Sequence, residues 1–208
     1  ERYQILRCPV SPIQPDLMDL FTPIDEPPVV HIPGLELHRD VITPEQEQKL
    51  MEWIDAQPWL EDLSRKVQHY GFKYDYRARS IDVSSRLGDL PQMLQRLATH
   101  LSNNQNALPF APEQAIVNEY QPGQGISAHV DCEPCFGPDI ASLSLGSTAV
   151  MKFTHLATKE VVDITLPRRS IVVLSGESRT AWSHAIPARK SDVISGTKQP
   201  RARRVSVT

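Results

Sequence analysis

The hydrophobic positions in the first half of the chain repeat at the period of an α-helix in two places. Around residue 91 they are spaced i, i+3, i+4, i+7 and i+11, which predicts one helix with an apolar face. These residues are Leu90, Met93, Leu94, Leu97 and Leu101. An earlier helix is predicted to begin at Thr43, where Pro44 and a capping box with Gln46 are typical of a helix start, and to stop before Pro58.

From residue 115 onward the pattern changes to short β-rich segments separated by glycine and proline. We predict strands over eight segments: 115–120, 126–129, 140–145, 149–153, 161–166, 170–174, 182–186 and 203–208. A further short strand is expected within 29–37. Many short strands after two helices predict an α+β protein with an antiparallel sandwich or jelly roll.

Residues 1–28 are rich in proline and predict an extended arm ahead of a single domain over 29–208. No apolar run is long enough to cross a membrane, and the first residues lack the pattern of a signal peptide. Three cysteines are too few for a secreted disulfide scaffold. We therefore expect a monomer that contacts no membrane, in a reducing compartment that is cytoplasmic, or nuclear in a eukaryote.

The net charge of −3 hides an uneven distribution of charge along the chain. Residues 1–62 carry thirteen Asp/Glu and four Lys/Arg, a net of −9, so residues 63–208 sum to +6. A basic half within a mildly acidic protein suits a polyanionic partner. A solvated basic face would give the same count, so this observation leaves both interpretations open.

His129-Val130-Asp131 carries the clearest chemical signal in the chain. On a strand, residues i and i+2 point to the same face, so this histidine and this carboxylate would face one space. With His184 from another strand they would form the 2-His-1-carboxylate set typical of non-haem Fe(II) oxygenases. A short H-x-D also occurs by chance or in a core, so the neighbouring residues decide its meaning.

Two further predicted strands offer groups that can hold an anion beside such a metal. Asn118 and Tyr120 share one face of a strand, and both side chains can donate hydrogen bonds to a carboxylate. Arg204 and Ser206 share one face of the last strand. An inward arginine is costly to bury unless an anion meets it, and a dicarboxylate co-substrate would supply that anion.

Together these segments resemble the AlkB family of Fe(II)/2-oxoglutarate dioxygenases, from about Pro33 to the end of the chain. The motifs are N-x-Y-x-x-G-x-x-I-x-x-H-x-D over 118–131, S-L-S-L-G over 142–146, L-P-R-R-S over 166–170, G-E-S-R over 176–179, His184, and R-x-S-x-T over 204–208. The segments 65–76 and 142–190 are most similar to a subgroup that includes an animal tRNA-hydroxylating member and bacterial proteins of similar length.

The resemblance implies a double-stranded β-helix core with two supporting helices. It implies Fe(II) ligands at His129, Asp131 and His184. It implies a second group of residues around 2-oxoglutarate: Asn118, Tyr120, Ser142, Arg204 and Ser206. With O2 as the third reactant, oxidative decarboxylation of 2-oxoglutarate would be coupled to hydroxylation of a C–H bond. The family also has a second arginine six residues after the first, at a position beyond Thr208.

Residues 65–86 are the candidate for substrate recognition. The stretch 69–79 alternates aromatic and cationic residues, as do platforms that stack single-stranded nucleic acid, although an amphipathic hairpin shows the same alternation. In the family this region is a nucleotide-recognition lid, which implies that the substrate is contacted by Phe72, Tyr74 and Tyr76. The resemblance also makes Glu133 and Arg179 candidates for substrate contact near the metal.

The resemblance implies an enzyme whose partner is nucleic acid, either single-stranded DNA or RNA, with tRNA included. Oxidative demethylation of N-alkylated bases is the favoured reaction, because no second module accompanies the domain. The alternative is hydroxylation of a modified wobble uridine in tRNA, and a non-catalytic nucleic-acid binder with the same fold is a third interpretation. Cys132-x-x-Cys135 is expected to be an incidental loop, because one cysteine pair cannot complete a zinc site.

Overall fold

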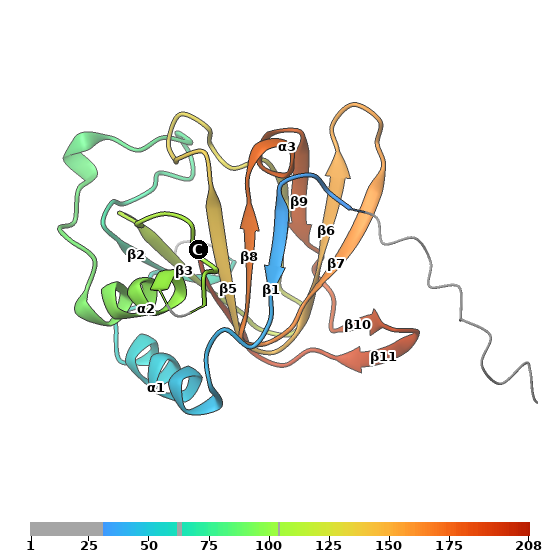
Figure 1. The fold of residues 1–208 in the computed structure, drawn as a ribbon, viewed down its shortest axis with the longest axis horizontal. Coiled ribbons are helices and arrows are strands. Elements are labelled where there is room, and N and C mark those ends of the chain that lie inside the picture. The colour runs from blue at the N-terminus through green and yellow to red at the C-terminus, as the bar shows by residue number, and fades with distance from the viewer. Residues whose placement is uncertain (1–30, 62–63, 104) are drawn as a thin grey trace, which may run out of the picture. The chain divides into compact units, whose positions relative to one another are not determined.

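The computed structural model describes residues 31–61, 64–103 and 105–208, so the predicted arm over 1–28 lies outside the described residues. Two antiparallel sheets and a separate hairpin contain the strands of this part of the chain (Figure 1). The major sheet has the order β1 (Leu35–His38), β8 (Ser170–Leu174), β5 (Ile140–Gly146), β12 (Arg204–Val207), β3 (Ala115–Tyr120) and β2 (Lys66–Tyr70). The minor sheet has the order β4 (Ile126–His129), β9 (Trp182–Ile186), β6 (Ala149–His155) and β7 (Val161–Leu166).

Two longer helices, α1 (Pro44–Asp55) and α2 (Gln92–Asn103), cover one face of the major sheet (Figure 1). Their apolar faces, including Ile54 and Leu94, pack against alternate residues of the sheet. Those sheet residues include Val117, Leu143, Leu145, Ile171 and Val205. Because side chains alternate along a strand, the intervening residues of β3, β5 and β12 face the opposite side, toward the minor sheet.

A second apolar cluster fills part of the space between the two sheets. Val172 and Leu174 of β8 meet Phe153 of β6 and Ile186 of β9 there. Phe153 and Leu166 are fully buried. One layer of helices and two facing sheets therefore make up the jelly roll, and the predicted fold class is confirmed.

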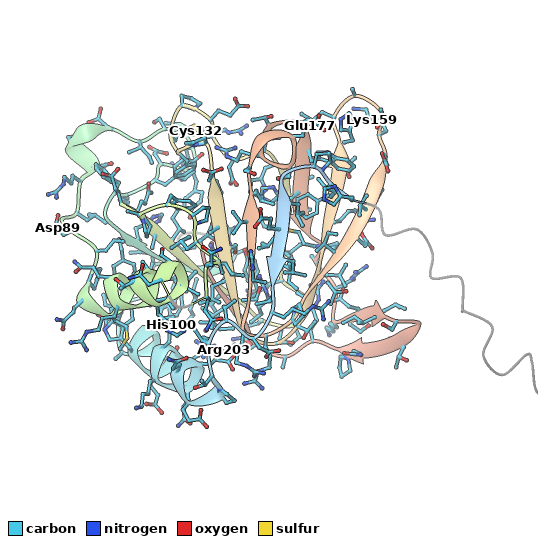
Figure 2. The ribbon with its side chains drawn as sticks, in the orientation of Figure 1. Asp89, His100, Cys132, Lys159, Glu177 and Arg203 are labelled. Atoms are coloured by element: carbon cyan, nitrogen blue, oxygen red, sulfur yellow. A yellow bond between two sulfur atoms is a disulfide. The ribbon has the colours of Figure 1, made fainter. Side chains whose placement is uncertain are left out.

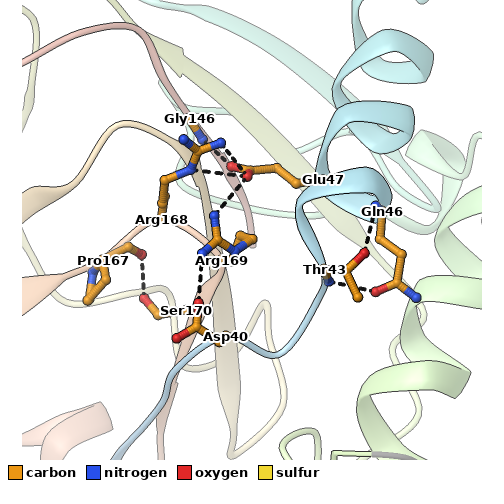
Figure 3. A network of polar contacts seen from close by, with 9 residues as sticks. All are labelled: Asp40, Thr43, Gln46, Glu47, Gly146, Pro167, Arg168, Arg169 and Ser170. Carbon is orange, nitrogen blue, oxygen red and sulfur yellow. Dashed lines mark hydrogen bonds and ion pairs between the residues drawn. The ribbon is translucent and has the colours of Figure 1, made fainter.

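A buried carboxylate joins α1 to the connections between strands (Figure 3). Glu47 is 2% exposed, and its Oε1 accepts the backbone N–H of Gly146 at 2.7 Å. Its Oε2 accepts from Nη2 of Arg168 at 2.7 Å and lies 3.5 Å from Nη1 of Arg169. Arg169 also donates to Asp40, so the two arginines of the L-P-R-R-S motif anchor the first helix rather than a ligand.

The predicted secondary structure agrees closely with the observed elements in the jelly roll and less well outside it. Five predicted strands have the observed bounds, namely β3, β4, β7, β8 and β9, and the Thr43 capping box is present. The hairpin of β10 (Ser191–Ile194) and β11 (Thr197–Pro200) and the short helix α3 (Gly176–Thr180) were not predicted. Among the described residues, no helix is long and apolar enough to span a membrane.

Candidate metal and co-substrate site

The three predicted metal ligands come together between β4 and β9. His129 and His184 are direct partners in the antiparallel register of these strands, and Asp131 follows two residues after His129. One potential ligand atom from each residue lies within 4.8 Å of the other two. Gly125, just before β4, permits this pairing, because a Cβ there would lie only 2.1 Å from the carbonyl oxygen of Ile186.

The hydrogen bonds around these side chains leave ligand atoms free for a metal. Nδ1 of His129 lies 2.8 Å from the carbonyl oxygen of Ser127, and a carbonyl can only accept, so Nδ1 carries the proton. The lone pair of the neutral ring is then on Nε2, which lies 3.5 Å from Oδ1 of Asp131. Nε2 of His184 lies 3.6 Å from the other carboxylate oxygen. This donor set fits a facial Fe(II) site with open positions.

Charge and burial set the protonation of the three groups. Burial lowers the pKa of His184 to about 4, so this imidazole is neutral at physiological pH. The pKa of Asp131 is lowered even though burial alone would raise it, because His129 and His184 stabilise the carboxylate. Burial acts to lower the pKa of His129, but hydrogen bonds to Asp131 and Ser127 outweigh it and raise that pKa.

A cavity of about 930 Å³ opens beside these ligands, and the predicted co-substrate residues line it. They are Asn118, Tyr120, Ser142, Arg204 and Ser206. All five belong to the inward-facing positions of β3, β5 and β12, as the alternation predicts. Figure 2 shows Cys132, which lies one residue after Asp131, at one end of the sheets and Arg203 at the opposite end.

Arg204 gives this cavity an unbalanced positive charge. It is 3% exposed, and among the residues that the structure describes no carboxylate pairs with it. Nη2 donates to Oγ of Ser144 at 2.8 Å, and the guanidinium carbon lies 5.5 Å from the ring centre of Tyr120. Nε has no hydrogen-bond partner within the part of the chain that the structure describes. Burial lowers the pKa of Arg204. A buried cation with an unused donor is stabilised by an anion, and a carboxylate of 2-oxoglutarate would be such an anion.

The segment predicted as the lid divides into two parts. Residues 66–70 form β2 and pair with β3, so they belong to the major sheet. The part that follows, 72–82, places Phe72, Tyr74 and Tyr76 in the wall of the cavity. Tyr74 packs edge-on against Tyr76 at 5.0 Å and contacts Phe136 at 5.4 Å, measured between ring centres. These rings form a packed aromatic wall of the cavity.

Two predicted substrate contacts lie outside this cavity. Glu133 is exposed and does not line it. Arg179 is 3% exposed, and its guanidinium donates to the backbone carbonyls of Asp131 and Cys132. Arg179 therefore supports the loop that carries the carboxylate of Asp131, and its contact with a substrate stays a prediction.

The structure adds groups near the cavity that the sequence analysis did not single out. Ser144 is the serine that bonds Arg204, whereas Ser142 bonds Thr208. Cys132 and Cys135 form a disulfide where an incidental loop was expected. Both sulfur atoms lie within 3.4 Å of the carbonyl oxygen of Arg79 in the lid. The motif offered no way to predict this contact, because its partner is more than fifty residues away in the chain.

Most of the basic side chains in residues 168–208 are paired with carboxylates or buried within the fold. Of the nine lysines and arginines in 168–208, five pair with carboxylates: Arg168, Arg169, Arg189, Arg201 and Arg203. Arg179 and Arg204 are buried, and Lys190 and Lys198 are exposed. The charge count therefore overstates the positive surface that this region offers to a polyanion.

A sequence profile described as the 2OG-Fe(II) oxygenase superfamily matches residues 35–208. The chain belongs to this superfamily. It is therefore a dioxygenase that uses Fe(II), 2-oxoglutarate and O2, which confirms the predicted cofactors. The matched range contains the whole of the three-ligand cluster and the cavity beside it.

Similar proteins place this oxygenase in the AlkB family, as predicted. It is 36% identical over 178 residues to the tRNA (carboxymethyluridine(34)-5-O)-methyltransferase ALKBH8 of Mus musculus, a match that covers 80% of the chain and 26% of that relative. It is 34% identical over 229 aligned positions to the alkylated DNA repair protein ALKBH8 homolog of Arabidopsis thaliana, covering 100% of the chain and 65% of the relative. The solved structure of OsALKBH1 has the same fold, with a TM-score of 0.60 at 15% identity over 85% of this chain and 98% of that one.

Proposed function

We propose that this dioxygenase hydroxylates a modified uridine of tRNA. His129, Asp131 and His184 bind Fe(II), and Arg204, with Asn118 and Tyr120, holds 2-oxoglutarate. The bound metal and co-substrate supply the oxidising power to insert one oxygen atom of O2 into a C–H bond of the substrate. The other residues of the cavity bind and orient the base, which must leave its stack to reach the metal.

The observation that carries this proposal is the position of Arg79. Its side chain lines the cavity on the lid side. Nη2 lies 3.3 Å from the carbonyl oxygen of Val130, the residue between His129 and Asp131 in the sequence. A guanidinium at this place suits a substrate group with a carboxylate, such as a carboxymethyl substituent on uracil. It disfavours bases that carry a positive charge, such as 1-methyladenine and 3-methylcytosine.

The name of the mouse relative supports the same substrate. Methyl transfer is not a reaction of an Fe(II)/2-oxoglutarate centre, so the mouse relative's name contributes only its substrate, carboxymethyluridine at position 34 of tRNA. The chain spans about a quarter of that relative's length, and the match covers 80% of a chain whose residues 35–208 match the oxygenase profile. We therefore place the hydroxylated carbon on the substituent of such a uridine.

Oxidative demethylation of an N-alkylated base is the second candidate. The Arabidopsis relative is named an alkylated DNA repair protein, and it matches over the whole of this chain. The aromatic wall of Tyr74 and Tyr76 can stack on a methylated base as readily as on a uridine. What separates the two candidates is the charge of the base that enters the cavity beside Arg79.

Mass spectrometry of the products from a substrate panel tests the proposal. The enzyme, supplied with Fe(II), 2-oxoglutarate and O2, is incubated with tRNA carrying carboxymethyluridine, unmodified tRNA, and single-stranded DNA and RNA carrying 1-methyladenine. We expect a gain of one oxygen on the modified uridine, with one succinate formed per product. Formaldehyde release with restored adenine, and no change in the uridine, would overturn the proposal in favour of demethylation.

Replacing Arg79 tests the observation directly. Arg79→Glu should raise the KM for the modified tRNA by about tenfold or more, since it exchanges an attraction for a repulsion at the same position. Arg77→Glu is the matched control, because Arg77 is an exposed lid residue that does not line the cavity. Equal effects of the two substitutions would mean that Arg79 contributes only to the overall charge of the lid.

A further inference from the structure

Arg65 connects two parts of the cavity wall that have different tasks. Its side chain lines the cavity and lies just ahead of β2. Nε donates a 2.9 Å hydrogen bond to Oδ1 of Asn118 on β3. The guanidinium carbon also lies 5.7 Å from the ring centre of Tyr76 in the lid. One half-buried guanidinium thus contacts both the co-substrate side and the substrate side of the cavity.

The hydrogen bond from Arg65 decides which way the amide of Asn118 faces. A guanidinium has only donors, so the group it contacts must be the amide oxygen. The NH2 group of Asn118 would meet the guanidinium donor-to-donor if the amide were turned over. With the oxygen held by Arg65, both N–H donors remain for a carboxylate in the cavity, where Asn118 is 7% exposed.

The contact of Arg65 with Tyr76 links the orientation of the Asn118 amide to the lid. A guanidinium near an aromatic ring is attracted by the ring's electron density, most strongly where water is excluded. The hydroxyl oxygen of Tyr76 is buried, and its ring packs edge-on against Tyr74. A shift of Arg65 toward or away from Asn118 therefore changes the packing of the lid rings.

We infer that Arg65 is a positioning residue that orients Asn118 for 2-oxoglutarate and couples co-substrate binding to closure of the lid. This inference rests on the proposed role of Asn118 and is independent of which base the enzyme accepts. It predicts an order of binding, in which the co-substrate binds first and thereby stabilises the lid that receives the substrate.

The effect of Arg65 on 2-oxoglutarate binding is measured by titration calorimetry. The co-substrate is titrated into the Fe(II)-loaded full chain, without O2 and without nucleic acid. Arg65→Ala should raise the Kd for 2-oxoglutarate by about tenfold, the effect of losing one hydrogen bond to a charged group. Arg65→Lys should recover most of the affinity, because an ammonium can also donate to Oδ1. Arg86→Ala is the matched control, since Arg86 is an exposed lid arginine that pairs with Asp89 and does not line the cavity.

A double-mutant cycle with Asn118→Ala separates an effect through Asn118 from a direct contact with the co-substrate. In the Asn118→Ala background, adding Arg65→Ala should change the Kd by less than about twofold. A full tenfold effect in that background would overturn the inference. Normal binding by Asn118→Ala alone would instead show that the proposed role of Asn118 is wrong, so the two failures are distinguishable.

Backbone hydrogen exchange measures the coupling to the lid. In the wild-type protein, saturating 2-oxoglutarate should slow hydrogen exchange over residues 72–80. In Arg65→Ala, saturating 2-oxoglutarate should leave the exchange rates of these residues unchanged. Arg86→Ala should retain the protection, which excludes a general loosening of the lid. Equal protection in Arg65→Ala and wild type would overturn the coupling, whatever the Kd values are.

Discussion

Asp131 lies between the two histidines, and Arg179 supports the backbone of the loop that carries it. Its two carboxylate oxygens each face the Nε2 atom of one histidine, and the guanidinium of Arg179 donates to its backbone carbonyl at 2.8 Å. The backbone at Asp131 is therefore fixed by a hydrogen bond that does not depend on an ion. This preorganisation means that replacing Asp131 should remove a ligand without disturbing the surrounding strands.

Asp131→Ala should reduce succinate formation by more than about 100-fold, the upper end of the loss seen when even an outer partner of a metal ligand is removed. Affinity for the nucleic acid should stay within about threefold, because the lid and the aromatic wall are unchanged. Succinate is measured by mass spectrometry and affinity by anisotropy, with the exposed carboxylate of β7 as control, Asp163→Ala. Unchanged succinate output in Asp131→Ala would rule out Asp131 as a metal ligand.

At the scale of single residues, the alternation along strands made part of the site predictable. The i, i+2 rule places His129 with Asp131 and Asn118 with Tyr120, and each pair lines the predicted cavity. Contacts across long stretches of chain could not be predicted in this way. Arg65 meets Asn118, which lies 53 residues later in the chain. The register between β12 and β5 pairs Ser144 with Ser206, so the hydrogen bond from Arg204 to Ser144 runs diagonally across the two strands.

At the scale of elements, α1 is attached to the jelly roll by one acidic side chain as well as by its apolar face. Glu47 accepts hydrogen bonds from Arg168 and from the backbone of Gly146, which adopts a left-handed conformation with φ of 77°. A Cβ at Gly146 would lie 2.6 Å from the carbonyl oxygen of Arg203. The carboxylate therefore stabilises the turn that brings β5 to its end beside β12.

Glu47→Ala should lower the free energy of unfolding by roughly 3 kcal/mol, because it leaves Arg169 and the Gly146 N–H without this acceptor in a buried place. Glu47→Gln should cost less, since the amide oxygen can still accept from Gly146. Urea denaturation measures both, with Glu52→Ala on the exposed side of α1 as the matched control, expected to cost under about 1 kcal/mol. Similar losses for Glu47→Ala and Glu52→Ala would contradict this role.

The β10–β11 hairpin is fastened at its base by a second buried carboxylate. Asp192 is 2% exposed and accepts hydrogen bonds from Arg189 and Arg201, each as short as 2.6 Å. Burial acts to raise the pKa of Asp192, but the two arginines outweigh it and hold that pKa below 3.8. The carboxylate thus stabilises the fold above the usual pKa, and its contribution is lost as pH falls through the lower folded-state value.

Asp192→Asn should lower the free energy of unfolding at neutral pH by roughly 3 kcal/mol, because two arginines lose a charged partner. The difference from wild type should begin to shrink as pH falls below 3.8, where the unfolded carboxyl is protonated, and should vanish below the lower folded-state pKa, where the native carboxyl is also neutral. Urea titrations across this pH range measure the difference in unfolding free energy between Asp192→Asn and wild type. Asp89→Asn is the control, because Asp89 forms an exposed ion pair with Arg86. A gap that is constant with pH would show that the charge of Asp192 does not contribute.

The elements that were predicted and those that were not differ in their burial patterns. A strand that is buried at every position, such as β8, appears in the sequence as a short apolar run between turn residues. Its predicted bounds therefore agree with the observed ones. In contrast, β11 is exposed at all four positions, and it pairs with β10 through a turn at Ser195 and Gly196, so no alternation marks it. The helix α3 has five residues, too few for a helical period to show.

At the scale of the whole molecule, two apolar clusters support the fold independently of the metal. One lies between the helices and the major sheet, and the other includes residues of both sheets around Phe153. The strands that carry His129 and His184 are joined by backbone pairing, which needs no ion. This differs from small zinc domains, in which the metal supplies the folding energy.

Removing the metal with a chelator should therefore abolish activity and leave the far-ultraviolet circular dichroism unchanged. The melting temperature should fall by only a few degrees, because the metal stabilises the folded state through binding alone. Restoring Fe(II) should restore activity without a refolding lag. A chelator-treated protein that loses its β-sheet signal would show that the ion is part of the structural core.

The position of β12 has a consequence for synthesis. This strand lies between β5 and β3 in the middle of the major sheet, although residues 204–207 are made after the other five strands of that sheet. On the ribosome, the two halves of that sheet cannot be joined until residue 207 has passed through the exit tunnel. A nascent chain that stalls a few codons earlier would leave the facing edges of β3 and β5 open to pairing with other chains, and would mark itself for chaperones or proteases.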